Sequence, residues 1–214
     1  MLAGHYAPAL LIKQIADKRG WNVRLWPLCI AVQAVDIGFM ALVLANVELG
    51  KVDNANAPHF TVVHGMWTHS LLMTGVYGAV TFGLALLFAP MKGRKDGVRL
   101  GIIAAIAVMS HWVGDLVVHV PDLPLGLADT PAVGLGLWRW PLAATALEIG
   151  LVAVTAGRFR LVAGFLIVVQ VCNDLVLPLD TDQKLLAVKA LALYAGVALL
   201  AWRSEGRMGG PAAR

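Results

Sequence analysis

Long apolar stretches separated by short polar connections dominate the chain. Six of these stretches have about 18–22 residues, which is enough to cross about 30 Å of hydrocarbon as an α-helix. The predicted spans are residues 28–48, 68–88, 98–119, 137–156, 159–179 and 185–202. The pattern therefore predicts an all-α fold, a polytopic bundle of six transmembrane helices that forms one domain over residues 1–203.

The two ends of the chain fall outside this pattern. Residues 1–16 are apolar but too short to span a bilayer, so they predict either an interfacial helix or a half-helix tucked into the bundle. In the half-helix arrangement, His5 and Asp36 lie about 12 Å and about 18 Å above the basic residues near the predicted inner surface, and they can meet near mid-membrane. Residues 204–214 are rich in Gly, Pro and Arg and predict a disordered cytoplasmic tail.

The composition favours a membrane protein and excludes two other classes. Hydrophobic residues make up 59% and charged residues 14% of the 214 residues, whereas about 25% of a soluble domain is charged. This apolarity excludes a disordered chain and argues against a small soluble domain. The two cysteines lie in predicted spans, so they indicate neither a disulfide framework nor a zinc finger.

Basic residues are unevenly distributed among the connections. Thirteen of the 17 Lys and Arg residues lie on one side of the predicted bundle, before the first span, after the sixth, and in two of the connections. The positive-inside rule therefore predicts that both termini are cytoplasmic. The net charge of +4 then reflects topology in the plasma membrane and does not indicate a nucleic-acid partner.

Several ionisable side chains lie inside the apolar stretches. A charged group near mid-bilayer costs about 2.5–3.5 kcal/mol on insertion scales, so such residues must face the bundle interior and find partners. The set comprises Asp36, His69, His111, Asp115, His119, Glu148 and Asp174. Because Lys189 is the only basic residue well inside a predicted span, we expect a bound divalent metal ion to neutralise the acids.

The third span carries the clearest metal-binding pattern. His111, Asp115 and His119 are spaced i, i+4 and i+8, which rotates them by only about 40° per step and puts all three on one helical stripe. Neighbouring pairs on such a stripe can chelate one ion, and the full stripe can serve two. The alternative is a structural hydrogen-bonded pair of His111 and Asp115, which is the more common arrangement in soluble helices.

Two further candidate ligands flank the start of the second span. His64 and His69 are five residues apart, which is a poor spacing for a helical pair, but Gly65 permits a turn between them. We expect His69 to be the better ligand of the two. The alternative for His64 is an exposed loop histidine.

The remaining candidate ligands are His5, Asp36 and Glu148. The alternative for Glu148 is a protonated, hydrogen-bonded acid near the middle of the fourth span. Asp174, in the outer half of the fifth span, is expected to be a polar clamp between helices or a support for the metal ligands.

At these residues the chain resembles a known group, the bacterial inner-membrane metal-dependent hydrolases that include LexA-binding membrane-associated hydrolases. The resemblance covers about residues 1–150. The matching pieces are Gly4-His5-Tyr6-Ala7, Gln33-Ala34-Val35-Asp36, the run from His64 to Leu72 with its His69-Ser70-Leu71-Leu72, Ser110-His111-Trp112-Val113-Gly114-Asp115, His119-Val120-Pro121-Asp122-Leu123-Pro124 and Gly134-Leu135-Gly136-Leu137-Trp138.

This family is similar to the zinc-dependent phospholipases C, which are helical enzymes with a cluster of zinc ions. The similarity implies that His111, Asp115 and Glu148 are metal ligands. The late His-x-x-x-Glu pair of those enzymes is absent, since Ala144 stands four residues before Glu148. The resemblance therefore implies a metal site more directly than it implies a reaction.

Four functional hypotheses follow. The first is a membrane-embedded, metal-dependent hydrolase, with zinc as the expected ion, Asp36 or Asp115 as general base, and a lipid or amphiphilic phosphoester as substrate. The second is a non-catalytic subunit or scaffold of a larger membrane complex, in which the cluster holds a structural metal or a polar network. A b-type haem between histidines on facing spans is a third hypothesis, and metal-ion or proton transport is a fourth.

Overall fold

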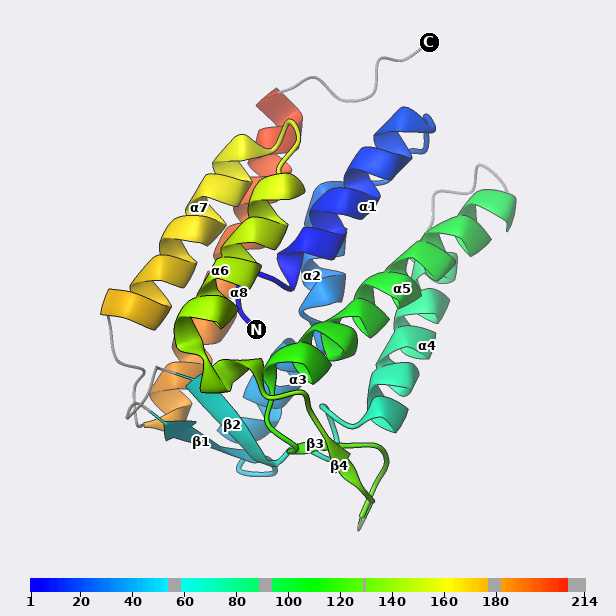
Figure 1. Ribbon diagram of the computed structural model, residues 1–214. Coiled ribbons are helices and arrows are strands. Elements are labelled where there is room, and N and C mark those ends of the chain that lie inside the picture. The colour runs from blue at the N-terminus through cyan, green and yellow to red at the C-terminus, as the bar shows by residue number, and fades with distance from the viewer. Residues whose placement is uncertain (54–58, 89–93, 129, 177–181, 208–214) are drawn as a thin grey trace.

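The computed structural model describes residues 1–53, 59–88, 94–128, 130–176 and 182–207, and it is mostly helical (Figure 1). The α-helices in this part of the chain are α1 (Tyr6–Lys18), α2 (Leu25–Val32), α3 (Ala34–Leu44), α4 (Leu71–Phe88), α5 (Arg94–Val118), α6 (Pro141–Val154), α7 (Arg160–Val171) and α8 (Gln183–Arg207). A 3₁₀ turn (Leu137–Arg139) precedes α6, and a π-helical turn (Cys172–Val176) follows α7.

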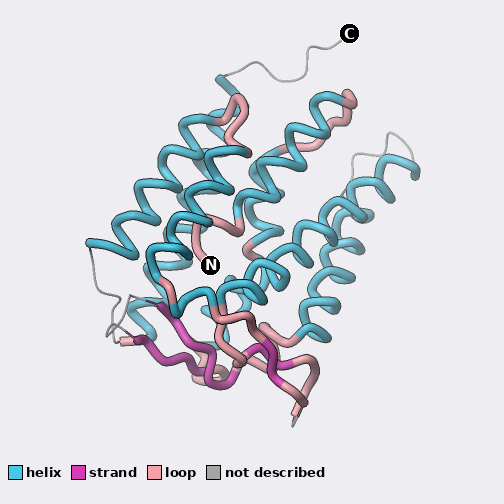
Figure 2. Tube along the Cα trace, in the orientation of Figure 1, coloured by secondary structure: helices cyan, strands magenta, loops and turns pink. Residues whose placement is uncertain are grey.

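Two small antiparallel hairpins complete the fold. The first pairs β1 (Leu49–Asp53) with β2 (His59–His64), and the second pairs β3 (Leu123–Pro124) with β4 (Ala132–Val133). Figure 2 shows both hairpins at the same end of the helical bundle, below the ends of α3, α5 and α6. They close the end of the bundle at which α5 stops and α4 begins.

The prediction of six membrane spans is wrong. In the described part of the chain, α4, α5 and α8 are long and apolar enough to cross a membrane, and α2 with α3 forms a fourth candidate that is bent by 55°. The predicted fourth and fifth spans contain only 14 and 12 α-helical residues in α6 and α7, or about 21 Å and 18 Å of helix. The apolar residues counted in these two predicted spans include turns outside α6 and α7. A count of apolar residues does not distinguish such turns from α-helix.

Most of the helices pack around one large apolar core, and α3 and α8 share a second, smaller one. Leu10 of α1, Val32 of α2, Val108 of α5 and Leu166 of α7 are buried members of the large core. Helix α4 packs against α5 at the edge of the bundle and leaves most of its apolar side chains exposed. An outward-facing apolar surface of this kind suits a membrane protein, in agreement with the candidate spans.

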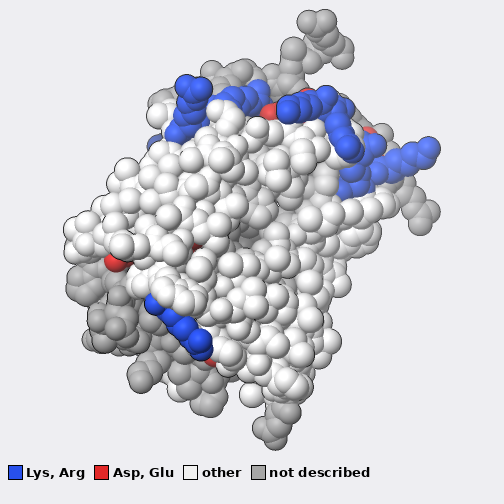
Figure 3. Space-filling model, in the orientation of Figure 1, with Lys and Arg blue, Asp and Glu red and all other residues white. Residues whose placement is uncertain are grey.

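Lys and Arg side chains gather at one end of the molecule, whereas the surface between the two ends is mostly uncharged (Figure 3). This basic end is the one at which α1 and α8 finish and at which α5 and α7 begin (Figure 1). The basic connections that the sequence analysis assigned to one side of the bundle therefore lie together at this end.

The N-terminal segment matches one of its two predicted alternatives, whereas the C-terminal segment differs from its prediction. Figure 1 shows the N-terminus in the middle of the bundle, and α1 runs from there to the basic end, so it is the half-helix of the two alternatives. At the other end of the chain, α8 continues to Arg207 and includes the first four residues of the predicted tail. Residues 208–214 lie outside the described residues.

Candidate metal centre

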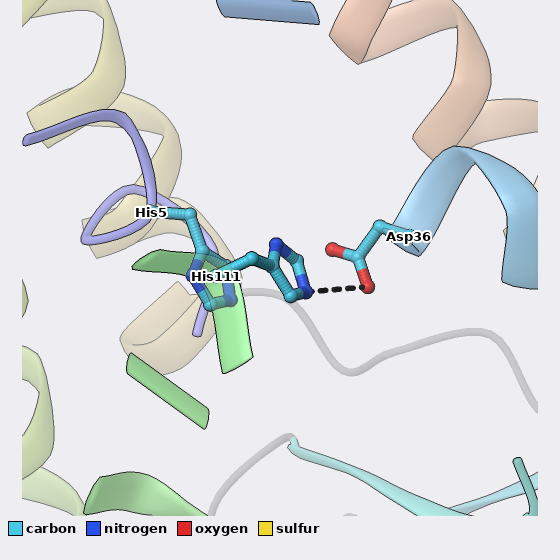
Figure 4. A group of neighbouring side chains, drawn as sticks. All are labelled: His5, Asp36 and His111. Carbon is cyan, nitrogen blue, oxygen red and sulfur yellow. Dashed lines mark ion pairs between the residues drawn. The ribbon is translucent and has the colours of Figure 1, made fainter. Parts of the chain in front are cut away.

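Four histidines and two aspartates meet inside the bundle, and they come from four separate segments. The six residues are His5 just before α1, Asp36 of α3, His69 just before α4, His111 and Asp115 of α5, and His119 just after α5. Figure 4 shows three of them, with the His5 ring against His111 and with His111 paired to Asp36. The expected meeting of His5 and Asp36 is confirmed, since both belong to one potential metal-binding group.

The α5 stripe is confirmed. Nε2 of His111 lies 3.1 Å from Oδ2 of Asp115, and Nε2 of His119 lies 3.7 Å from Oδ1 of the same residue. The backbone N–H of His119 donates to the carbonyl of Asp115 at 2.8 Å, so the helical turn continues to the end of the stripe.

Asp115 is the centre of the cluster because its two oxygens face different histidines. Oδ1 lies 3.0 Å from Nε2 of His5, and Oδ2 lies 3.9 Å from Nε2 of His69. The α-amino group of Met1 also donates to Oδ1 at 3.1 Å. The Nε2 atoms of His5 and His111 are buried and make no hydrogen bond within the described residues, although both are close to Asp115.

Asp36 faces the same two histidines as Asp115. Its Oδ1 lies 3.3 Å from Nε2 of His69 and 3.5 Å from Nε2 of His111, and the same two nitrogens face Oδ2 of Asp115. These nitrogen–oxygen distances run from 3.1 to 3.9 Å, and neighbouring donors of a tetrahedral zinc ion are about 3.3 Å apart. Two groups of three side chains lie close enough together to hold an ion: His5, Asp36 and His111, and His69, His111 and Asp115.

Hydrogen bonds outside the cluster determine how the imidazole rings are oriented. Nδ1–H of His111 donates to the carbonyl of Val32 at 2.7 Å, and Nδ1 of His119 lies 2.9 Å from a carboxylate oxygen of Asp122, which can only accept. When a neutral ring carries its proton on Nδ1, the lone pair is on Nε2. Nε2 of His111 faces both aspartates, and Nε2 of His119 faces Asp115.

His69 is oriented through a longer chain of contacts. The Thr68 hydroxyl donates to Oε2 of Glu48 at 2.6 Å, so its oxygen is available to accept from Nδ1–H of His69 at 2.9 Å. Oε1 of Glu48 accepts from the backbone N–H of Trp67 at 2.7 Å, and Glu48 is fully buried. All three rings therefore direct Nε2 into the cluster, as metal-binding histidines with outer hydrogen bonds do.

Two glycines permit close contacts at the site. A Cβ on Gly114 of α5 would lie 3.1 Å from Nδ1 of His5, so the absent side chain leaves room for the N-terminal segment next to Asp115. A Cβ on Gly134 would overlap the carbonyl oxygens of His119 and Val120. Glycine therefore allows the β4 segment to lie directly against the end of α5.

Glu148 does not join the other candidate ligands. Its Oε2 accepts hydrogen bonds from the backbone N–H groups of Leu2 and Gly4, and it belongs to neither potential metal-binding group. Asp174 is the expected helix clamp, since its Oδ2 accepts from Thr145 of α6 and from Gln170 of α7, both at 2.6 Å. His64 ends β2, but its side chain lies outside the part of the chain that is described.

Sequence reasoning missed two residues at the site. Glu48 counted only as the end of the first predicted span, and Tyr194 of α8 was overlooked, although its hydroxyl donates to Oδ2 of Asp36 at 3.1 Å. A buried acid at the end of a span and a tyrosine inside an apolar helix were the available signals. Neither signal identifies a partner, because each partner is distant in sequence or in another helix.

No known family, curated protein or solved structure matches the chain. The family suggested by the sequence resemblance is therefore not identified. The structure itself shows a helical protein with several apolar helices and a buried His/Asp cluster that can hold a metal ion.

Proposed function

We propose that this protein is a membrane-embedded, metal-dependent hydrolase, and that its His/Asp cluster binds a divalent ion. The supporting observation is the orientation of three imidazoles, which donate from Nδ1 to groups outside the cluster and face Asp36 and Asp115 with Nε2. Asp36 and Asp115 face the same histidine nitrogens, and carboxylates this close repel each other unless a proton or a cation neutralises them; the Met1 ammonium lies 3.1 Å from Oδ1 of Asp115, and Asp36 has no such cation within the described residues. Imidazole and carboxylate donors favour zinc.

Asp115 supports a centre of one or two ions. One of its oxygens faces His69 and His111, and the other faces His5 and His119. A carboxylate placed in this way can bridge two metal ions, which is a common feature of hydrolytic two-metal centres. His111 belongs to both potential donor groups, one with His5 and Asp36 and the other with His69 and Asp115, and we assign the first ion to His111 with ligands from both groups.

The proposed reaction is hydrolysis of a lipid or amphiphilic phosphoester. A bound zinc ion lowers the pKa of its water toward about 7 and polarises a phosphoryl oxygen. The aspartate that does not bind the ion, Asp36 or Asp115, leaves a coordination position to water and can act as the general base. Asp36 is the more accessible of the two, with 14% of its side chain exposed. The cluster lies on helices that are candidate membrane spans, which favours a substrate that enters from the membrane.

Metal analysis of the full chain purified in detergent tests this proposal. We expect one or two zinc ions per chain after zinc loading, and loss of most of this metal in His111→Ala and Asp115→Ala. Ser110→Ala is the matched control, because within the described residues the Ser110 hydroxyl bonds only to a carbonyl of its own helix. A wild-type protein that binds no zinc, or variants that keep all of it, would reject the metal centre.

A specific observation favours a second candidate, a non-catalytic metal or polar cluster within a larger membrane complex. Apart from Asp36, the side chains of the cluster are at most 5% exposed. A closed site of this kind suits a structural ion, whereas a catalytic zinc keeps an open coordination position.

Cobalt distinguishes the two candidates. In the Co(II)-loaded protein, inorganic phosphate should change the visible absorption if a coordination position is open, and a phospholipase and phosphatase screen should then find activity that Asp36→Asn abolishes. An unchanged spectrum together with no hydrolysis would favour the structural cluster.

A further inference from the structure

A second buried polar group lies beside the metal cluster and contacts the first residues of the chain. Residues 1–4 form no regular secondary structure and run through the bundle interior, so their backbone N–H groups need acceptors there. Oε2 of Glu148 accepts from two of these N–H groups, at 2.8 and 3.1 Å. Oε1 of Gln170 accepts from the N–H of Ala3, which lies between them, at 2.8 Å.

The two acceptor side chains are themselves held in place. Nε2 of Gln170 donates to Oδ2 of Asp174, and the Thr145 hydroxyl donates to the same oxygen. Because its amide nitrogen is engaged by Asp174, Gln170 directs its oxygen toward the N-terminal segment. Glu148 and Gln170 are each only 1% exposed, so water does not compete for these bonds.

The segment leads directly to a residue of the metal cluster. His5 follows it, places Nε2 3.0 Å from Oδ1 of Asp115, and stacks its ring on that of His111 with centroids 3.7 Å apart. The N-terminal segment is therefore held on one side by α6 and α7, and it meets α5 at its other end.

We propose that Glu148 and Gln170 are positioning residues that hold the backbone of residues 2–4 and thereby present Nε2 of His5 to the metal ion. The inference rests on the proposed metal centre. Glu148 acts through His5 and is not itself a ligand. His5 then connects α6 and α7 to the helices that carry Asp36, His111 and Asp115.

Co(II) titration of the full chain in detergent, followed by visible absorption, tests the proposal. We expect His5→Ala and Glu148→Ala each to weaken Co(II) binding by about 10–100-fold and to change the spectrum in the same way, because both remove the same ligand. The double variant should bind no more weakly than either single variant. Glu148→Gln keeps an oxygen acceptor and should stay within about threefold of the wild type, as a positioning role requires.

Thr155→Val is the matched control. Thr155 lies at the end of α6 and is buried like Glu148, but in the part of the chain that is described its hydroxyl bonds only to carbonyls of its own helix, so wild-type affinity is expected. If Glu148→Ala fails to fold, Gln170→Leu takes its place. This variant removes the side chain that accepts from the N–H of Ala3, and its Co(II) affinity and spectrum are compared with those of His5→Ala in the same way.

The possible outcomes separate this proposal from the proposed function. Additive losses in the double variant, or a Glu148→Gln variant as weak as Glu148→Ala, would show that Glu148 is an independent ligand and would overturn the positioning role. Metal binding that is insensitive to His5→Ala would also overturn it. A wild-type protein without Co(II) bands would reject the metal centre itself, and this proposal with it.

Discussion

Nδ1–H of His111 donates to the carbonyl of Val32 across 2.7 Å, and this contact joins the metal cluster to the bend between α2 and α3. The two helices meet at Gln33 at an angle of 55°, which interrupts the helical hydrogen bonds beside Val32. A break of this kind inside a membrane helix is tolerated where other groups satisfy the freed backbone atoms. The bend therefore orients His111 and carries Asp36 on its far side.

Replacing His111 separates its two roles. His111→Asn keeps a donor near the position of Nδ1, so it should keep the bond to the carbonyl of Val32. It loses the nitrogen that faces Asp115, so we expect its zinc affinity to fall by at least about tenfold. His111→Ala leaves that carbonyl unpaired, and the metal-free protein should be less stable than His111→Asn by about 1–3 kcal/mol. Zinc content and unfolding of the two metal-free variants measure the difference, and equal stability would contradict the role of the Val32 contact.

The contacts between Glu48 and His69 give a second prediction. Thr68→Val removes the hydroxyl that links Nδ1 of His69 to Glu48 while keeping the shape of the side chain, and it should weaken zinc binding by about 10–100-fold. Thr81→Val is the control, because that hydroxyl bonds, among the residues that the structure describes, only to a carbonyl of its own helix. Equal zinc affinities in competition with a chelator would count against this orienting role.

Gly134 gives a prediction about stability. Gly134→Ala puts a methyl group into the backbone of residues 119 and 120, so the β4 segment must move away from α5, and we expect a loss of about 1–3 kcal/mol in the free energy of unfolding. Gly150→Ala in α6 is the control, since an added Cβ there meets no described atom within 4 Å. Thermal unfolding in detergent measures both, and equal stabilities would contradict the tight contact.

Removal of the metal should destabilise the whole bundle. The donors come from α3, α5 and the segments before α1 and α4, so an ion at the cluster joins elements that are far apart in the sequence. Zinc at 100 times its dissociation constant should add about 2.7 kcal/mol to the free energy of unfolding. Chelation should lower the unfolding temperature, and zinc should restore it where magnesium does not, because magnesium prefers oxygen donors. An unchanged unfolding temperature after verified loss of metal would show that the ion does not join these elements.

The sequence by itself determined the features that depend on local periodicity and on the cost of burying charge. The stripe of His111, Asp115 and His119 follows from the repeat of the helix, whatever packs against it. The meeting of His5 with Asp36 could be expected because both are polar groups at similar depths in apolar segments, where only the interior offers partners. The same reasoning predicted the helical class and the clamp at Asp174.

The tertiary structure alone decided which helices are candidate spans, how the imidazoles are oriented and which groups Glu148 accepts from. Apolar composition does not reveal where backbone hydrogen bonding is interrupted, so the bend at Gln33 and the short α6 and α7 could not be read from it. Glu148 is 144 residues from Gly4, whose N–H it accepts, and Glu48 is 20 residues from Thr68. Each buried donor needs an acceptor, but which acceptor it finds depends on the packing of segments that are distant in the chain.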